Sequence, residues 1–159
     1  NHIANQYKGP IGRNPLILND NITVLPGDGR TGSSGTVPSH YADGKYVYTN
    51  GISNRNFEST VENIQTAIIP HESWSHNRNN WGNNNGQHHK AYLNEIDFPR
   101  FPATTDLFKA TTVNSLKSYL FKEGVNFNSL DQFYQETYFK YKNPPSETIV
   151  LNPIIIQGK

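Results

Sequence analysis

Three stretches of the chain carry apolar residues at helical spacing, and they limit the fold more than any other feature of the sequence. The first, residues 59–69, opens with a capping box formed by Ser59 and Glu62. The second, residues 113–123, is followed by Gly124, which fits a C-terminal cap. The third, residues 130–141, has the strongest period, and an aromatic stripe of this kind is typical of core packing. The stripes consist, in order, of Val61, Ile64 and Ile68; Val113, Leu116 and Leu120; and Leu130, Phe133, Tyr134, Thr137, Tyr138 and Tyr141.

The first sixty residues are rich in turns and contain short extended pieces. Residues 22–25 and 45–49 have the β-branched and aromatic character of strands, and residues 88–96 form a short helix candidate. Residues 148–151 and 154–156 are apolar and predict short strands or a tail. We therefore predict an α+β fold. Residues 1–159 would form one compact domain, with a few helices and with short strands in a loop-rich N-terminal third.

The composition narrows the class of protein further. Hydrophobic residues make up 34% and charged residues 17% of the chain, yet aromatic residues reach 12%, which favours a folded domain over a disordered one. No run approaches the roughly 18 apolar residues of a membrane span. A formal net charge of +1 argues against a nucleic-acid binder held by bulk charge. The chain has no Met and begins with Asn1, so we expect a processed chain or a piece of a longer one.

Histidines cluster in the middle of the chain, where four of the six fall between positions 71 and 89. Because the chain has no Cys, any metal must be held by imidazoles and carboxylates. Catalytic zinc commonly has three protein ligands and one open position, and it lowers the pKa of a bound water to about 7. We predict a Zn(II) site with His71, His76 and either His88 or His89 as ligands. Glu72 would be the base that takes the proton of the metal-bound water.

The spacing of the first two histidines departs from the familiar zincin pattern His-Glu-x-x-His. His76 lies five residues after His71, and on an ideal α-helix the two side chains would point about 140° apart. Three arrangements would resolve this: a π-bulge or helix break, a helix that restarts at Pro70, or Glu72 and His76 as the i, i+4 ligand pair. We favour the first two, since the third leaves no base assigned.

The choice between the two adjacent histidines depends on which face of their helix is buried. His89 shares a face with Tyr92 and Ile96, which favours His89 over His88 as the third ligand. The alternative to the whole hypothesis is that the histidines are incidental surface groups.

The same residues resemble a known family. The string HESWSH, residues 71–76, followed by a Gly and then by HHKAY, residues 88–92, looks like the zinc metallopeptidase domains at the C-termini of Rhs-type polymorphic toxins, especially those of Bacteroidetes. The resemblance covers about residues 59–110 and includes a Thr-rich stretch ahead of Phe108 and Lys109. It implies that His71, His76 and one of the His pair are metal ligands and that Glu72 is the catalytic carboxylate.

The resemblance also carries expectations about biology. Such domains are cleaved from a large carrier, so this one would be secreted or delivered into a target cell as the C-terminal part of that carrier. Its substrate would be a protein or peptide of the target cell, and a cognate immunity protein would be its partner. The leading hypothesis is thus a zinc-dependent peptidase or amidase that acts as an antibacterial effector toxin.

Three other functions fit parts of the sequence. A nuclease of the His-metal finger type would use His88 and His89 with Asn94. A metal-free cell-wall glycosidase would use Glu72 as general acid and Asp97 or another carboxylate as its partner. The third is a binding module without enzymatic activity.

Overall fold

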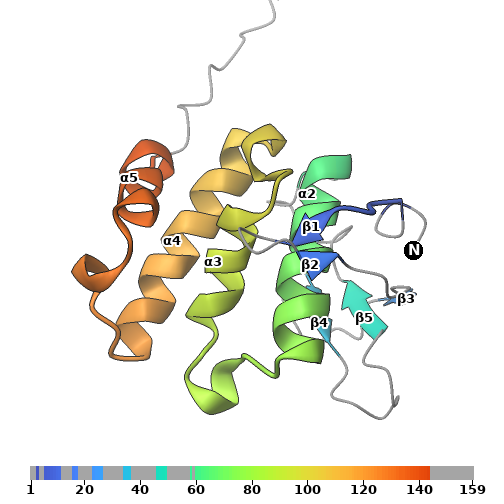
Figure 1. Ribbon diagram of the computed structural model, residues 1–159, viewed down its shortest axis with the longest axis horizontal. Coiled ribbons are helices and arrows are strands. Elements are labelled where there is room, and N and C mark those ends of the chain that lie inside the picture. Colours follow the sequence, from blue (N-terminus) through green and yellow to red (C-terminus); the bar gives the residue numbers. More distant parts are fainter. Residues whose placement is uncertain are drawn as a thin grey trace, which may run out of the picture.

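A computed structural model of the chain describes Ile3, Glu58 and residues 6–11, 16–17, 23–26, 34–36, 46–49 and 60–143. These described residues are predominantly helical (Figure 1). The helices are, in chain order, α2 (Val61–Thr66), η2 (Ala67–Arg78), η3 (Asn83–Asn85), α3 (His89–Asp97), η4 (Phe101–Ala103), α4 (Asp106–Lys122), η5 (Phe127–Ser129) and α5 (Gln132–Tyr141). η2 is a π-helix, whereas η3, η4 and η5 are single 3-10 turns. Within this part of the chain, no helix combines the length and the apolar character needed to cross a membrane.

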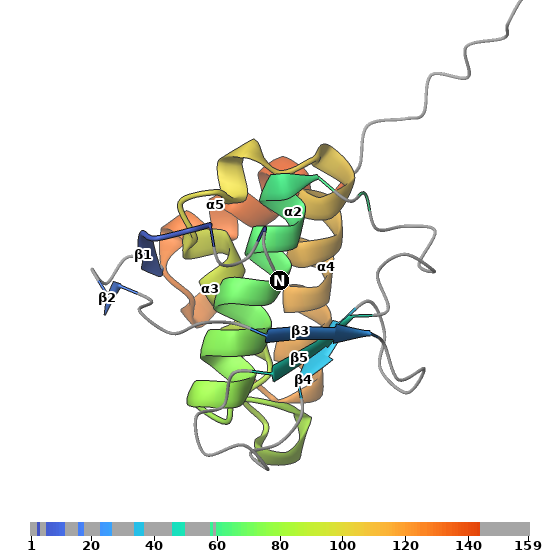
Figure 2. The ribbon, with the colours of Figure 1, turned by 90° about the vertical axis from the view of Figure 1, so that its right-hand side faces the viewer.

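The described strands are short and belong to two sheets. They are β1 (Pro10–Ile11), β2 (Leu16–Ile17), β3 (Thr23–Pro26), β4 (Ser34–Thr36) and β5 (Tyr46–Thr49). β1 pairs antiparallel with β2, while β5 lies between β3, its parallel neighbour, and β4, its antiparallel neighbour. β4 and β5 lie beside η2 (Figure 2). β3 and β5 overlap the expected strands, but the α+β class stays a prediction, and residues 148–151 and 154–156 lie outside the described residues.

The first predicted helix is present but differs from the expectation at both ends. Thr60 caps it, because its hydroxyl oxygen accepts a hydrogen bond from the Asn63 amide at 3.1 Å. The helix then runs past residue 69, since the chain continues through Pro70 as the π-helix η2. The buried Asn63 side chain joins this helix to the start of α4, accepting from the Thr105 amide at 3.0 Å and donating to the Thr105 hydroxyl at 3.0 Å.

The remaining helix predictions are confirmed, with one helix longer than expected. α3 and α5 match residues 88–96 and 130–141 to within two residues at each end. Gly124 has a φ of +68° and follows the end of α4, as a C-terminal cap requires. α4 begins seven residues earlier than predicted, where Thr105 caps it. The apolar pattern did not indicate its first two turns because they carry mostly polar residues.

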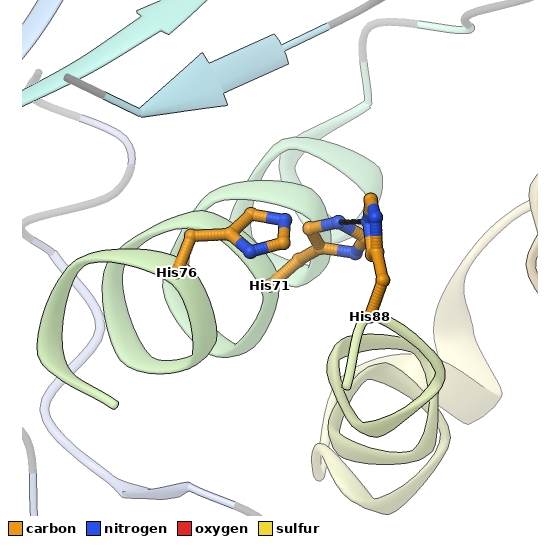
Figure 3. Close-up of side chains that lie close together, drawn as sticks. All are labelled: His71, His76 and His88. Atoms are coloured by element: carbon orange, nitrogen blue, oxygen red, sulfur yellow. Dashed lines mark hydrogen bonds between the residues drawn. The ribbon is translucent and has the colours of Figure 1, made fainter. Parts of the chain in front are cut away.

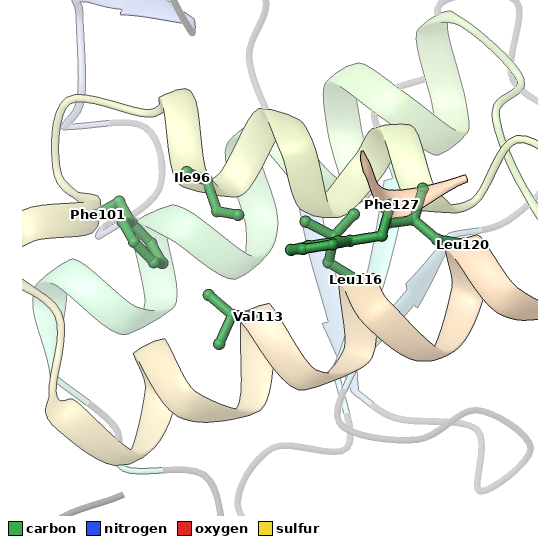
Figure 4. Close-up of a cluster of buried hydrophobic side chains, with 6 residues drawn as sticks. All are labelled: Ile96, Phe101, Val113, Leu116, Leu120 and Phe127. Atoms are coloured by element: carbon green, nitrogen blue, oxygen red, sulfur yellow. The ribbon is translucent and has the colours of Figure 1, made fainter. Parts of the chain in front are cut away.

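The main apolar core consists of buried side chains of α3, η4, α4 and η5 (Figure 4). The predicted stripe on α4 is buried there, and three tyrosines of α5 pack against it. Phe133 departs from the predicted stripe, since 41% of its surface is exposed. The buried members of this core are Ile96, Phe101, Val113, Leu116, Leu120 and Phe127. A second cluster of Ile68, Ile69 and Phe98 joins the η2 region to the end of α3.

Candidate metal centre

Three of the predicted histidines converge where η2 meets the start of α3. The side chains of His71 and His76 project from η2, and that of His88, the residue directly before α3, points toward them (Figure 3). One ring nitrogen from each of the three lies within 4.8 Å of the others. His71 is 7% exposed, whereas His76 and His88 are half-buried. A group of this kind can hold a metal ion.

The π-helix explains how two histidines five residues apart reach one point. In this geometry, hydrogen bonds join residues i and i+5, and the turn is wider than in an α-helix, so His71 and His76 lie on the same side of η2. The rings of His71 and His76 accordingly have centroids 4.8 Å apart. Of the three arrangements considered from the sequence, the structure therefore has the first, and the helix does not restart at Pro70.

Each histidine uses its Nδ1 atom to contact a protein acceptor. His71 Nδ1 lies 2.5 Å from Glu95 Oε1, and His88 Nδ1 lies 2.8 Å from Asn83 Oδ1. His76 Nδ1 contacts the carbonyl oxygen of Trp81. A carboxylate or carbonyl oxygen only accepts, so the hydrogen belongs on Nδ1 in all three rings. The Nε2 atoms are thereby left with lone pairs that can coordinate a metal, and the acceptors fix the orientation of the rings.

The spacing of one pair of nitrogens, on His71 and His88, matches that of two ligands on a zinc ion. Two imidazole nitrogens at about 2.0–2.1 Å from a tetrahedral zinc ion lie about 3.3 Å from each other. His71 Nε2 and His88 Nε2 are 3.2 Å apart (Figure 3). Two lone pairs facing each other at this distance repel unless a cation or a proton lies between them. The donor set therefore suits a borderline divalent ion such as Zn(II).

The histidines differ in basicity. Burial, reinforced by the positive charge of His71, lowers the pKa of His76 to about 4. Burial and the charges of His71, His76 and Lys122 lower the pKa of His88 to about 3. Burial alone would also lower the pKa of His71, but the adjacent carboxylates of Glu95 and Glu72 outweigh it and raise that pKa. Of the three rings, that of His71 is thus the one whose surroundings favour the protonated form.

Two buried carboxylates accompany the imidazoles. Glu72 is 3% exposed and Glu95 4% exposed. Glu95 is held from both sides, since its second oxygen accepts from the Thr112 hydroxyl at 2.6 Å. The charge of Glu72 acts on His71 and on Tyr92, whose pKa is raised chiefly by burial. A divalent cation would neutralise two carboxylates that are costly to bury without a counterion.

The structure does not bring His89 into the group. Its side chain is buried, as the sequence predicts, but it faces the other way: Nδ1 lies 2.6 Å from Glu123 Oε2. The same carboxylate accepts from the backbone amides of His88 and His89 at 2.9 and 3.2 Å. Glu123 therefore anchors the start of α3, and the third imidazole of the group is that of His88.

Tyrosines lie against the third histidine. The ring centroid of Tyr119 is 4.1 Å from that of His88, and Tyr92 stacks on His88 at 5.3 Å. Trp74 packs against the apolar cluster of Ile68, Ile69 and Phe98. Tyr92 and Tyr119 therefore form the aromatic side of the centre.

The residues invoked for the other functions have separate positions. Asp97 lies at the last position of α3, where it accepts a hydrogen bond from the Tyr134 hydroxyl at 2.5 Å. Asn94 donates to the Ser75 hydroxyl at 2.9 Å. Neither belongs to the group of three histidines.

Sequence reasoning missed the residues that support the ligands, above all Glu95. A signal for it exists: His88, Tyr92 and Glu95 lie at i, i+4 and i+7, which is one face of a helix. The acceptor Asn83 begins the single 3-10 turn η3 and Trp81 lies just before it, where no periodic signal could have found them.

We compared the chain with protein-family models, with curated proteins and with solved structures, and none of them matches it.

Proposed function

We propose that this chain is a zinc-dependent hydrolase that cleaves peptide or amide bonds. His71, His76 and His88 would be the ligands, and Glu72 the general base. The observation that carries the proposal is the common arrangement of the three rings, in which each Nδ1 meets an oxygen acceptor and one ring nitrogen of each lies within 4.8 Å of the others.

The three ligands would leave one position of a tetrahedral ion open. A zinc ion held in this way supplies Lewis acidity and lowers the pKa of a water at the open position to about 7. Glu72 follows His71 directly and is buried. Its carboxylate would accept a proton from the attacking water and pass it to the departing amine. Glu95 would keep His71 in the tautomer and orientation that coordination needs.

Delivery as a toxin belongs to the same proposal, through the resemblance of HESWSH and HHKAY to the C-terminal metallopeptidase domains of Rhs-type toxins. In that case the domain would act inside a target cell, and an immunity protein would protect the producing cell.

The test compares the wild-type chain with Glu72→Gln and with the matched control Glu62→Gln, which lies in the first turn of α2. Wild type and both variants should bind close to one equivalent of zinc by elemental analysis. Glu72→Gln should lower hydrolysis of a protein substrate by about 10²–10⁴-fold and should abolish growth inhibition when the chain is produced inside bacteria. Glu62→Gln should behave as the wild type.

Three results would count against the proposal. A wild-type chain that binds no zinc would remove the metal. Activity that persists in chelator would favour a metal-free glycosidase. Loss of zinc in Glu72→Gln would make Glu72 a ligand rather than the base.

A further inference from the structure

We propose that Ser75 and Asn94 are positioning residues that hold η2 in the π register and so bring His76 to His71. This inference rests on the metal site proposed above. The hydrogen bonds of Ser75 and Asn94 described below join them to Pro70 and to each other, and not to the three histidines.

The contact at the centre of this proposal spans five residues. The Ser75 hydroxyl donates to the carbonyl oxygen of Pro70 at 2.6 Å, and both residues are fully buried. In an α-helix, a serine hydroxyl bonds back to a carbonyl three or four residues earlier. A bond to the fifth residue matches the hydrogen-bond spacing of a π-helix instead. The Ser75 side chain therefore favours the register that the backbone of η2 adopts.

Asn94 sets the direction of that bond from the neighbouring helix. Its Nδ2 atom on α3 donates to Ser75 Oγ at 2.9 Å. A hydroxyl has a single hydrogen, so Ser75, once it accepts from Asn94, directs that hydrogen to Pro70. α3 thus fixes the register of η2 from the side while it also carries His88 at its own start.

The end of η2 repeats the five-residue pattern. The backbone amide and the side-chain amide of Asn79 both donate to the carbonyl of Trp74, at 3.1 and 2.8 Å. Near the beginning of η2, Pro70 disfavours the α-helical register. Pro70 has no amide hydrogen, and in an α-helix its ring would crowd the carbonyl of Thr66. α2 ends at that residue.

The consequence for the metal centre is geometric. If η2 relaxed to an α-helix, His76 would swing about 140° away from His71. Loss of the Ser75–Asn94 contact should therefore weaken metal binding although every ligand remains.

The test uses Ser75→Ala and Asn94→Asp in the full chain. An aspartate can only accept, so it would draw the Ser75 hydrogen away from Pro70. Its added negative charge would by itself favour a cation, so a loss of affinity in Asn94→Asp cannot be an effect of charge. Two matched controls remove similar side chain–to–backbone bonds elsewhere: Ser129→Ala, whose hydroxyl donates to Asn126, and Asn114→Ala, whose amide donates to Lys142.

The readouts are zinc affinity, measured by competition with a chelator, and the visible spectrum of the Co(II)-loaded protein, which reports coordination geometry. Both test variants should bind zinc about 10–100-fold more weakly and should change the Co(II) spectrum, while the controls match the wild type. The melting temperature of the metal-free proteins separates weaker metal binding from a general loss of stability. The metal-free Asn94→Asp variant should melt close to the temperature of the metal-free wild type.

The outcomes distinguish the two proposals. A wild-type chain without affinity for zinc or Co(II) would overturn the proposed function. A wild-type chain that binds zinc, together with an Asn94→Asp variant of equal affinity and unchanged Co(II) spectrum, would overturn the positioning role alone.

Discussion

His71 differs from His76 and His88 in the partner of its Nδ1 atom. A carboxylate faces it, whereas neutral oxygens face the other two rings. The negative charge of Glu95, supported by Glu72, raises the pKa of His71 above its ordinary value of about 6.5. The pKa values of His76 and His88, about 4 and about 3, leave these two rings neutral at the pH where His71 gains or loses its proton. Of the three rings, His71 is therefore the one that binds a proton most readily in the metal-free centre.

Zinc should displace that proton. Since metal and proton compete for His71 Nε2, zinc uptake at pH 6 should release close to one proton per ion. The affinity should fall about tenfold per pH unit as the pH decreases from the raised pKa of His71 toward 5, and it should level off above that pKa. Calorimetry in buffers of different ionisation enthalpy measures the proton release directly.

Glu95→Gln is the control for this prediction. The amide keeps an acceptor for His71 Nδ1 but removes the charge, so the pKa of His71 should fall and fewer protons should leave at pH 6. Zinc uptake by the wild type without proton release at that pH would contradict the assignment.

At the scale of the elements, α3 shows why the sequence alone favours His89, whereas the structure places His88 beside His71 and His76. His89 aligns with Tyr92 and Ile96, whereas His88 aligns with Tyr92 and Glu95, and both patterns are helical. What separates them is Glu123 at the end of α4, which binds the His89 ring and both backbone amides. A contact between residues 34 positions apart has no signal in local periodicity.

The helices themselves were largely predictable, and the π-helix was not. Apolar spacing and caps locate α3, α5 and the end of α4 to within two residues. The five-residue spacing of His71 and His76 indicated that a regular α-helix could not serve, but it left three arrangements open. The choice among them depends on Ser75, on Pro70 and on Asn94 of another helix, and periodicity does not report such contacts.

The adjacent histidines give a matched pair of variants. His88→Ala should lower zinc affinity by at least about 100-fold, because it removes a ligand, whereas His89→Ala should keep the affinity within about tenfold of wild type, as expected of a residue outside the ligand set. His89→Ala should instead destabilise the fold, since it leaves the buried Glu123 carboxylate with one partner fewer. Zinc titrations and urea denaturation of both variants separate the two effects. The reverse order of affinities would make His89 the ligand.

For the whole molecule, the proposed metal centre lies between η2 and the start of α3. His71 and His76 lie on η2, which the Ile68–Ile69 cluster packs against Phe98, while His88 lies at the end of α3 that is anchored to α4. A bound ion would therefore cross-link the π-helix to the rest of the helical bundle. Because such an ion binds the folded chain better than the unfolded one, it should stabilise the protein as a whole.

Zinc should accordingly raise the melting temperature. Free zinc at 100 times its dissociation constant adds about 2.7 kcal/mol to the free energy of unfolding. For a chain of this length, that amounts to a rise of about 5–10 °C. Chelator should reverse the rise, and His88→Ala should show none; a wild-type melting temperature indifferent to zinc and chelator would contradict a cross-linking ion.

The size of this rise should depend on pH, and its sign follows from His71. Its folded pKa is raised, so protonation stabilises the metal-free protein fully below the unfolded value of about 6.5, and this contribution is lost as the pH rises through the folded value. Zinc replaces the proton, and it binds more tightly where the proton has left. At one total zinc concentration, the rise should be larger at pH 8 than at pH 5.5, as differential scanning fluorimetry can measure. An equal or larger rise at pH 5.5 would mean that His71 does not hold the proton that the metal displaces.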